Sequence, residues 1–260
     1  MCIRDRPSYF DIKFKDVSFT YEGMKEKALH QLSFECQTDS VTAIVGPSGS
    51  GKSTIFNLIT RFYDVGSGTV MIGDVDVRDM AYEDLMSNIS YVFQETKLFK
   101  TSLLENIRFY RPEATRDEVE QVIDQAQCRE IINKMPNGLD TVFGTSGSYL
   151  SGGEIQRITI ARAMLKDAPI ILLDEATAFS DAENEYKIQQ ALSSMIKNKT
   201  VIMIAHRLST ITHADQILVM KEGELVEKGQ HKSLITQNGV YANMYNDYQQ
   251  SINWKLGVKK

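Results

Sequence analysis

Residues 46–54 read GPSGSGKST and constrain this chain more than any other segment. The apolar run Val41–Val45 leads into them, and a helix-compatible stretch, residues 53–60, follows. In this strand–loop–helix setting the pattern G-x-x-x-x-G-K-[ST] predicts a phosphate-binding loop, because its glycines let successive backbone N–H groups point into one concavity. We therefore expect a nucleoside triphosphate, held by Gly46, Pro47, Ser48, Gly49, Ser50, Gly51, Lys52, Ser53 and Thr54.

Side chains in and near this loop have the chemistry for metal-assisted hydrolysis. Lys52 supplies an ammonium for the β and γ phosphates, and the Ser53 hydroxyl can ligate Mg²⁺. The apolar run Ile170–Leu173 ends in Asp174 and Glu175. We predict that Asp174 is a metal residue and that Glu175 orients or deprotonates the attacking water. An Asp-Glu pair after a strand can also be only a helix N-cap.

Composition narrows the class of protein. With 260 residues and 42% hydrophobic content, the chain can bury a large core. A net charge of −5 without clustered Lys and Arg argues against nucleic acid as a partner. The three cysteines, Cys2, Cys36 and Cys128, are odd in number and scattered, as in a reducing compartment. No apolar run reaches the roughly 18 to 20 residues that cross a bilayer, and no signal peptide is evident, so we expect a soluble domain.

Hydrophobic patterning indicates two kinds of strand. Residues Phe10–Tyr21 alternate, as in a half-buried strand, and Leu32–Cys36 is a possible antiparallel partner. The runs Val41–Val45, Ile170–Leu173 and Val201–Ala205 lack alternation and end in polar groups, which is typical of parallel strands buried on both faces.

A helical block lies between the phosphate loop and the parallel-strand runs Ile170–Leu173 and Val201–Ala205. Between residues 97 and 167 the pattern is helical, with a capping box at Thr115 and Glu118 and a second helix over Gly153–Leu165. We expect this block to form an inserted lobe. The N-terminal residues 1–8 fit no strand and are interpreted as a leader or artefact, residues 9–248 as one domain, and residues 249–260 as a tail.

Five motifs occur in the order and approximate spacing of an ATP-binding cassette. They are GPSGSGKST, Gln94 in YVFQE, LSGGE at 150–154 followed by Gln156-Arg157, ILLDEA at 171–176, and His206 in IAHRLST. The chain thus resembles the nucleotide-binding domain of an ABC transporter over about residues 9–248. The resemblance implies an α/β P-loop NTPase (RecA-like) with a parallel-sheet core, an antiparallel β layer and an inserted α-helical lobe. It also implies ATP and Mg²⁺ as cofactors.

The resemblance assigns roles to single residues. Tyr21 matches the aromatic residue that stacks on adenine, although an ordinary strand aromatic is the alternative. Gln94 matches the glutamine that reaches Mg²⁺ and the attacking water. His206 matches the switch histidine that touches the γ phosphate and steadies Glu175, and a core histidine is its alternative.

The motif LSGGE implies a second cassette as partner. Ser151, Gly152, Gly153 and Glu154 match a second anion-binding helix start, far from the first loop within one chain. By resemblance, two cassettes pack head to tail, and Ser151 and Gly153 of one reach the γ phosphate on Lys52 of the other. ATP then holds the pair together, and hydrolysis lets it open. The Asp181 side chain belongs to the loop that links the two cassettes.

Three segments depart from the family pattern. Glu154 replaces the usual glutamine and adds negative charge near the triphosphate, which we expect to weaken or retune the composite site. The linking loop reads Ala178-Phe179-Ser180-Asp181 and keeps only its Asp. The segment Thr141–Gly147 lacks the acidic residue that exporter cassettes place there for contact with the membrane domain.

Several stretches resemble exporter-type cassettes, among them VFQETKLFKTSLLENI and VYANMY. The expected partners are a second cassette, as homodimer or heterodimer, and a transmembrane domain preceding this one on a longer chain. The expected location is the cytoplasmic face of the plasma (inner) membrane. The stretch AFSDAENE resembles bacterial half-transporters that act as heterodimers, some of them handling iron siderophores.

The expected activity is ATP hydrolysis that powers transmembrane transport. One alternative is a soluble ATPase of the same family, although a repair-type protein would need a long heptad insertion and a translation-type protein usually carries two cassettes. The other alternative is a non-hydrolysing module in which ATP only clamps a dimer. Glu175 and His206 argue against that module, whereas Glu154 leaves it open.

Overall fold

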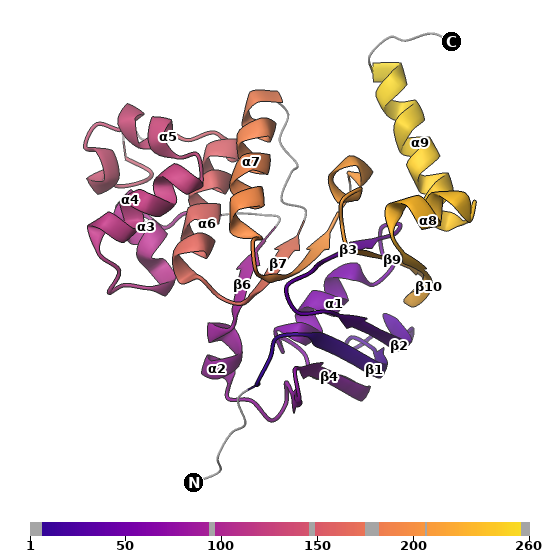
Figure 1. The fold of residues 1–260 in the computed structure, drawn as a ribbon. Coiled ribbons are helices and arrows are strands. Elements are labelled where there is room, and N and C mark those ends of the chain that lie inside the picture. Colours follow the sequence, from indigo (N-terminus) through magenta and orange to yellow (C-terminus); the bar gives the residue numbers. More distant parts are fainter. Residues whose placement is uncertain (1–6, 94–96, 146–148, 175–181, 206, 256–260) are drawn as a thin grey trace. The chain divides into compact units, whose positions relative to one another are not determined.

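The computed structural model describes residues 7–93, 97–145, 149–174, 182–205 and 207–255 (Figure 1). The chain forms two compact units, Met1–Ile89 with Asn198–Lys260, and Ser90–Lys197. The expected lobe of about residues 97–167 falls inside the second unit. No helix within these described ranges is long and apolar enough to cross a membrane.

The first unit contains an antiparallel sheet of order β2-β1-β4-β5, made of β1 (Ile12–Phe19), β2 (Leu29–Cys36), β4 (Ser67–Ile72) and β5 (Val75–Asp76). A short helix, α2 (Tyr82–Ser87), follows. Alternation in β1 buries Ile12 and Phe14, and the Phe14 ring stacks on Phe34 of β2 with centroids 4.6 Å apart. The predicted antiparallel pairing of these two strands is confirmed.

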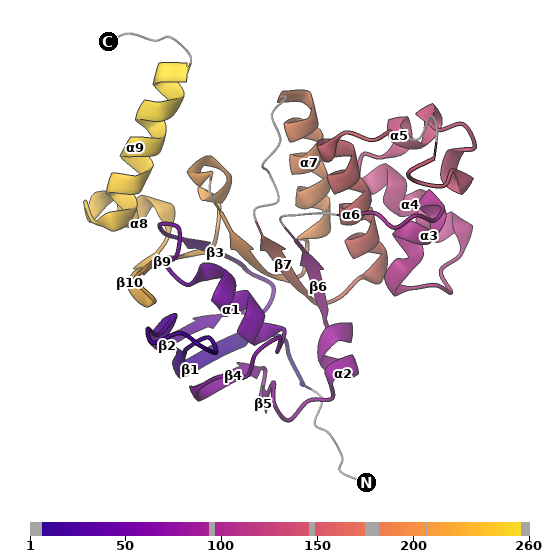
Figure 2. The same cartoon turned by 180° about the vertical axis from the view of Figure 1, so that it is seen from behind.

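The same unit holds parallel strands that carry the phosphate loop. Strand β3 (Val41–Val45) pairs in parallel with both β8 (Thr200–Ile204) and β9 (Gln216–Lys221), and β10 (Glu224–Gly229) returns antiparallel to β9. Both faces of β3 are covered, which explains why its sequence does not alternate. Helix α1 (Lys52–Ile59) lies between the two sheets in both views (Figures 1 and 2) and buries its apolar side chains there.

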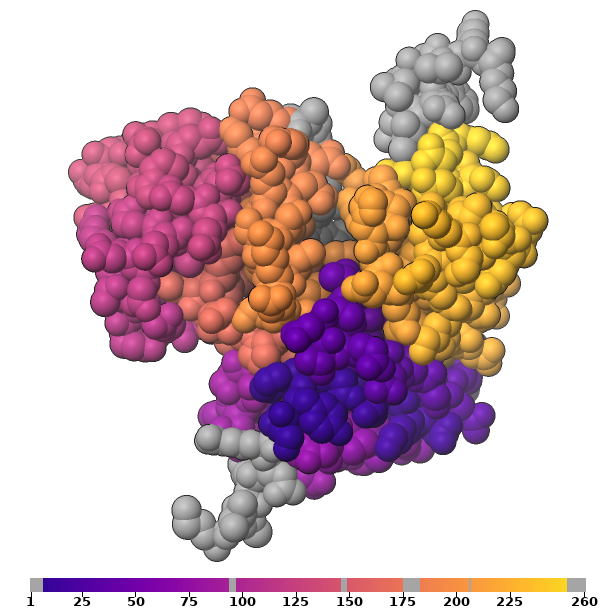
Figure 3. Space-filling model, in the orientation of Figure 1, coloured from indigo at the N-terminus to yellow at the C-terminus, as the bar shows by residue number. Residues whose placement is uncertain are grey.

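Two C-terminal helices, α8 (His231–Thr236) and α9 (Val240–Lys255), complete the first unit. The carboxylate of Glu227 on β10 accepts hydrogen bonds from the backbone N–H groups of Val240 and Tyr241, and so caps the start of α9. Tyr241 is fully buried beside the turn η3 (Leu208–Ile211) and strand β3. Figure 3 shows the early, indigo-to-purple segments of this unit adjoining the yellow C-terminal ones. Helix α9 continues beyond Tyr248, so the segment expected to be a tail from residue 249 is helical as far as Lys255.

In the second unit, strand β7 (Ile170–Asp174) lies next to β6 (Ile89–Val92). Helix α6 (Gly152–Lys166) lies between α7 (Ala182–Met195) and the smaller helices (Figures 1 and 2). The capping box predicted at Thr115 and Glu118 is confirmed. The smaller elements are α3 (Leu103–Ile107), η1 (Arg108–Tyr110), α4 (Arg116–Gln125), α5 (Arg129–Lys134) and η2 (Gly138–Asp140).

Candidate functional site

The loop between β3 and α1 adopts a backbone that glycine alone accepts easily. Gly46, Gly49 and Gly51 have φ of 153°, 78° and 95°. A Cβ at Gly46 would overlap the carbonyl oxygen of Met220, and one at Gly51 would lie 2.7 Å from the carbonyl oxygen of Ala28. At Gly49 no atom lies within 4 Å of an added Cβ. The loop is therefore pressed against its neighbours on one side and open at its middle.

Lys52 is held over this loop by the loop's own oxygens. Its Nζ donates hydrogen bonds to the carbonyl oxygens of Gly46 at 2.9 Å and Pro47 at 2.8 Å, and approaches Ser50 Oγ at 3.4 Å. The side chain is 6% exposed, and the first turn of α1 contains no acidic residue. A buried ammonium and the positive end of a helix therefore face the same small volume, which favours an anion.

Tyr21 is tied to α1 through its hydroxyl. This group is 3.0 Å from Thr54 Oγ1 and accepts a hydrogen bond from Asn57 Nδ2 at 3.1 Å. The Tyr21 ring meets the ring of Tyr63 edge-on, with centroids 5.1 Å apart. The adenine-stacking role of Tyr21 stays a prediction. Sequence reasoning missed Asn57, although its spacing of three residues from Thr54 places both side chains on one helix face.

The LSGGE segment forms the start of α6. Ser151 is the N-cap, and its hydroxyl accepts a hydrogen bond from the Glu154 N–H, while the Glu154 carboxylate accepts one from the Ser151 N–H at 2.8 Å. The N–H groups of Gly152 and Gly153 have no acceptor among the described residues. A Cβ at Gly153 would lie 3.1 Å from Asn184 Cγ on α7, so a larger residue there would require the Asn184 side chain to shift.

The charge of Glu154 is compensated inside the second unit. Its carboxylate forms an ion pair with Lys134 at 3.1 Å, and its side chain is 14% exposed. Burial by itself would raise the pKa of Glu154, but the hydrogen bonds from the Ser151 N–H and Lys134 outweigh it and hold the pKa below its ordinary value. The sequence alone did not reveal this compensation, because Lys134 lies twenty residues earlier.

Arg157, three residues after the last residue of the LSGGE motif, connects α6 to two neighbouring helices. Its side chain is 1% exposed, and its guanidinium donates to Asn184 Oδ1 and, at 3.1 Å, to Glu130 Oε1. Lys187 of α7 also binds Glu130, with both oxygens at 2.7 Å. Helices α5, α6 and α7 are therefore joined by one charged network, whose α6 member lies within the first two turns after the LSGGE motif.

Asp174 is the last residue of β7, as the sequence predicted. The Tyr91 hydroxyl donates a hydrogen bond to its Oδ2 at 3.4 Å. Burial, reinforced by the nearby Asp174 charge, raises the pKa of Tyr91, so this phenol stays a donor. Gln94, Glu175, Asp181 and His206 lie outside the described residues, and so do Ala178, Phe179 and Ser180. The roles predicted for them stay predictions.

Mg²⁺ binds through one or two protein oxygens together with substrate phosphates and water, and each unit, taken by itself, offers one oxygen donor of the expected kind. Ser53 is exposed at the start of α1, and Asp174 ends β7. Within the described ranges there is no group of three or more His, Cys, Asp or Glu side chains that would hold a metal without a phosphate ligand.

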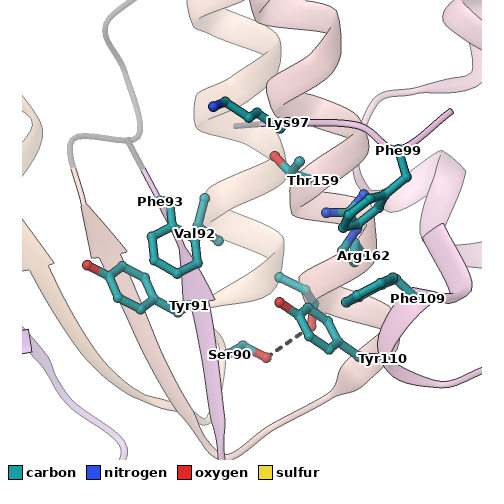
Figure 4. A pocket seen from close by; sticks show the side chains of 11 residues that line it. Ser90, Tyr91, Val92, Phe93, Lys97, Phe99, Phe109, Tyr110, Thr159 and Arg162 are labelled. Atoms are coloured by element: carbon teal, nitrogen blue, oxygen red, sulfur yellow. Dashed lines mark hydrogen bonds between the residues drawn. The ribbon is translucent and has the colours of Figure 1, made fainter. Parts of the chain in front are cut away.

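The second unit also contains an aromatic pocket of about 300 Å³ (Figure 4). Figure 4 shows Tyr91 and Phe93 on one side and Phe99, Phe109 and Tyr110 on the other. Arg162 lies between Phe99 and Phe109, 5.5 Å from each ring centroid, and donates to the backbone oxygen of Asn106 at 2.7 Å. Four of these rings are between 42% and 48% exposed, namely Phe93, Phe99, Phe109 and Tyr110.

A buried parallel strand, a glycine loop crossed by Lys52 and a helix opening at Gly51 define a P-loop NTPase of the α/β class. Residues 29–178 match the family described as ABC transporter. The chain belongs to that family, and it comprises the ATP-binding domain, which is the ATPase domain of ABC transporters.

Relatives and a solved structure agree with this assignment. The chain is 49% identical over 236 residues to an ATP-dependent lipid A-core flippase of Vibrio cholerae serotype O1, covering 90% of this chain and 40% of the relative. It is 45% identical over 240 residues to the protein of the same name from Haemophilus influenzae, covering 92% and 41%. A bacterial Atm1-family ABC exporter with ATP bound superposes with a TM-score of 0.87 at 39% identity, covering 95% of this chain and 44% of that one. The chain thus spans about two fifths of the length of the relatives it matches.

Proposed function

We propose that this chain powers transport across a membrane as the ATPase domain of an exporter-type ABC transporter. The observation that carries the proposal is the pairing of two anion-binding features in one chain. One is the loop under Lys52, and the other is the start of α6, where Gly152 and Gly153 present N–H groups without a described acceptor. A triphosphate has enough charge and length to bind the phosphate loop of one chain and the start of α6 of a second chain at the same time.

The proposed residue roles are those that the sequence motifs imply. Lys52 and the N–H groups of the phosphate loop bind and orient the β and γ phosphates, and Tyr21 supplies a face for adenine. Ser53, Asp174 and Gln94 would hold Mg²⁺, which neutralises phosphate charge when bound. Glu175 takes a proton from the attacking water, His206 steadies Glu175, and Asp181 contacts the second cassette. Ser151 and Gly153 close the site of the partner chain.

The negative charge of Glu154 was expected to weaken or retune the composite nucleotide site, but contacts within the chain favour a smaller effect. Its carboxylate is used within the chain as a cap and as the partner of Lys134. The added charge is therefore partly cancelled before any nucleotide binds, and we propose that the composite site remains competent for hydrolysis.

The aromatic pocket of the second unit is proposed to receive a helix of the transmembrane domain. Phe93, Phe99, Phe109 and Tyr110 expose apolar rings around a cavity with one buried cation, Arg162, which suits the end of an amphipathic helix. Relatives are more than twice as long as this chain, which leaves room for such a domain. The ATPase domain formed by the present chain would then lie at the cytoplasmic face of the inner membrane.

The substrate is proposed from the relatives alone. Two of them are named lipid A-core flippases, so an amphipathic lipid is the substrate class to test first. The interpretation as a siderophore-related heterodimer receives no support from these relatives and stays a prediction.

Phosphate release from ATP, measured over a range of protein concentrations, tests the proposal. Specific activity should climb with concentration as two cassettes pair. Glu175→Gln should still bind ATP but turn over about 100-fold or more slowly, because its amide cannot accept a proton. Lys52→Ala should lose triphosphate binding. Unchanged turnover in Glu175→Gln would remove the general-base role, and ATP binding without hydrolysis at every concentration would favour an ATP-clamped dimer module.

A further inference from the structure

The turn between β9 and β10 touches the phosphate loop, although no motif marks it. Lys221 pairs with Glu224 across the turn, and the two residues between them, Glu222 and Gly223, have φ of 52° and 80°. Positive φ at both central residues is the geometry of the tightest hairpin turns, which favour glycine at the second position. The turn is therefore a tight two-residue connection, and it lines an open depression beside Gly49.

Both peptide groups of Gly223 are used outside the hairpin. Its N–H donates a hydrogen bond to the carbonyl oxygen of Ser50 at 3.3 Å, and its carbonyl oxygen accepts one from the His30 N–H at 3.0 Å. A Cβ on Gly223 would lie 2.8 Å from the carbonyl oxygen of Ala28 and 2.9 Å from His30 Cδ2. Gly223 is thus wedged between strand β2 and the phosphate loop, where a side chain has no room.

The bond to Ser50 determines how the next N–H of the loop points. In a trans peptide the C=O and the N–H lie on opposite sides of the C–N bond. Because the Ser50 C=O points at the turn, the N–H of Gly51 in the same peptide points away from it. That N–H has no acceptor among the described residues. It therefore remains available to a phosphate oxygen at the start of α1.

We propose that the β9–β10 turn, through Gly223, is a positioning element that orients the Ser50–Gly51 peptide for binding the phosphates of a nucleotide. The turn also connects the phosphate loop to strand β1, which ends near Tyr21. Gly223 accepts a hydrogen bond from the His30 N–H, and the N–H of Ala28, two residues earlier, donates to the carbonyl oxygen of Phe19 on β1 at 2.8 Å. These bonds then hold the phosphate loop and Tyr21, the two ends of the proposed nucleotide site, at a set separation. This inference rests on the proposed ATP-binding function.

The test compares Gly223→Ala with Gly138→Ala in the binding of ADP and of adenosine. Gly138 also has positive φ, 55°, but the nearest atom to an added Cβ is 3.8 Å away and it lies in the other unit. Loss of one hydrogen bond to a charged phosphate should weaken ADP binding by Gly223→Ala about tenfold or more. Gly138→Ala should stay within about twofold, and adenosine, which lacks phosphates, should bind all three proteins equally.

Each outcome has a definite meaning. Unchanged ADP binding by Gly223→Ala, or an equal loss of adenosine binding, would overturn the inference while leaving ATP binding by the wild type in place. A wild-type chain that binds neither ligand would overturn the proposed function as well. If Gly223→Ala does not fold, hydrogen exchange of the Gly223 amide in the wild type decides instead: slower exchange with ADP supports the coupling, and equal rates with and without ADP exclude it.

Discussion

Replacing Glu154 by glutamine, the residue usual in the family, should destabilise this chain. In the wild type the Glu154 carboxylate accepts a hydrogen bond from the Ser151 N–H at 2.8 Å and pairs with Lys134 at 3.1 Å. The glutamine oxygen can still accept the first bond, because it needs no charge. The ion pair and the attraction of a carboxylate to the positive start of α6 are lost.

The expected loss can be sized from these two interactions. A carboxylate in the first turn of a helix contributes about 0.3–1 kcal/mol. An ion pair to a lysine that is 61% exposed contributes about 0.2–1 kcal/mol. We therefore expect Glu154→Gln to lower the free energy of unfolding by about 1 kcal/mol, which is about 2–4 °C in Tm for a chain of this size.

The pH dependence follows from the lowered pKa of Glu154. A carboxyl whose pKa is lower in the folded state stabilises the fold above its unfolded pKa, near 4.5, and that contribution is lost as pH falls through the folded pKa. Urea unfolding of wild type and Glu154→Gln should therefore differ most at neutral pH, and the difference should shrink as the solution is acidified.

A double-mutant cycle isolates the ion pair. Lys134→Met removes the cation and keeps much of the side-chain length, so the effect of Glu154→Gln should be smaller in that background. Equal stability of wild type and Glu154→Gln at neutral pH would refute the reasoning, and so would a deficit that persists unchanged in acid. The same variant, assayed for ATP hydrolysis, shows whether Glu154 retunes the composite site.

Two further predictions concern buried groups. Burial raises the pKa of Cys36 and Cys128 to about 12, so in a Cys2→Ser variant neither thiol should react with a thiol reagent near pH 8 until the chain is unfolded. Because the thiols of the unfolded chain ionise near their ordinary pKa of 9.0, the free energy of unfolding should fall as pH rises above that value. Rapid labelling of the native protein would contradict the buried placement of these thiols. Tyr91→Phe removes the hydroxyl that donates to Asp174, the proposed Mg²⁺ ligand, so the Mg²⁺ concentration for half-maximal ATP hydrolysis should rise about tenfold. A change below about twofold would mean that this hydrogen bond does not orient Asp174 for metal binding.

Features encoded by a few neighbouring residues were predictable from the sequence. The phosphate loop, the capping box at Thr115 and the unalternating strand Val41–Val45 each depend on short-range geometry, and the structure has all three. The family motifs likewise identified the ATPase domain. Helix α9 was underestimated, because the polar residues after Tyr248 looked like a tail when the capping role of Glu227 at the start of that helix was unknown.

Pairings between distant residues could not be predicted in this way. Lys134 lies twenty residues before Glu154, Asn184 lies twenty-seven after Arg157, and neither partner carries a local pattern that marks it. Asn57 was within reach, since its helical spacing from Thr54 is visible, but its bond to Tyr21 depends on how α1 packs against the antiparallel sheet.

The phosphate loop and the start of α6 are specified locally, because glycine conformations and helix caps arise within a few consecutive residues. The groups that support them are set by tertiary packing: Gly223 against Ser50, Lys134 against Glu154, and Glu130 with Lys187 around Arg157. These contacts depend on how whole strands and helices pack, because a hydrogen bond between segments far apart in the chain exists only once packing has brought its donor and acceptor together.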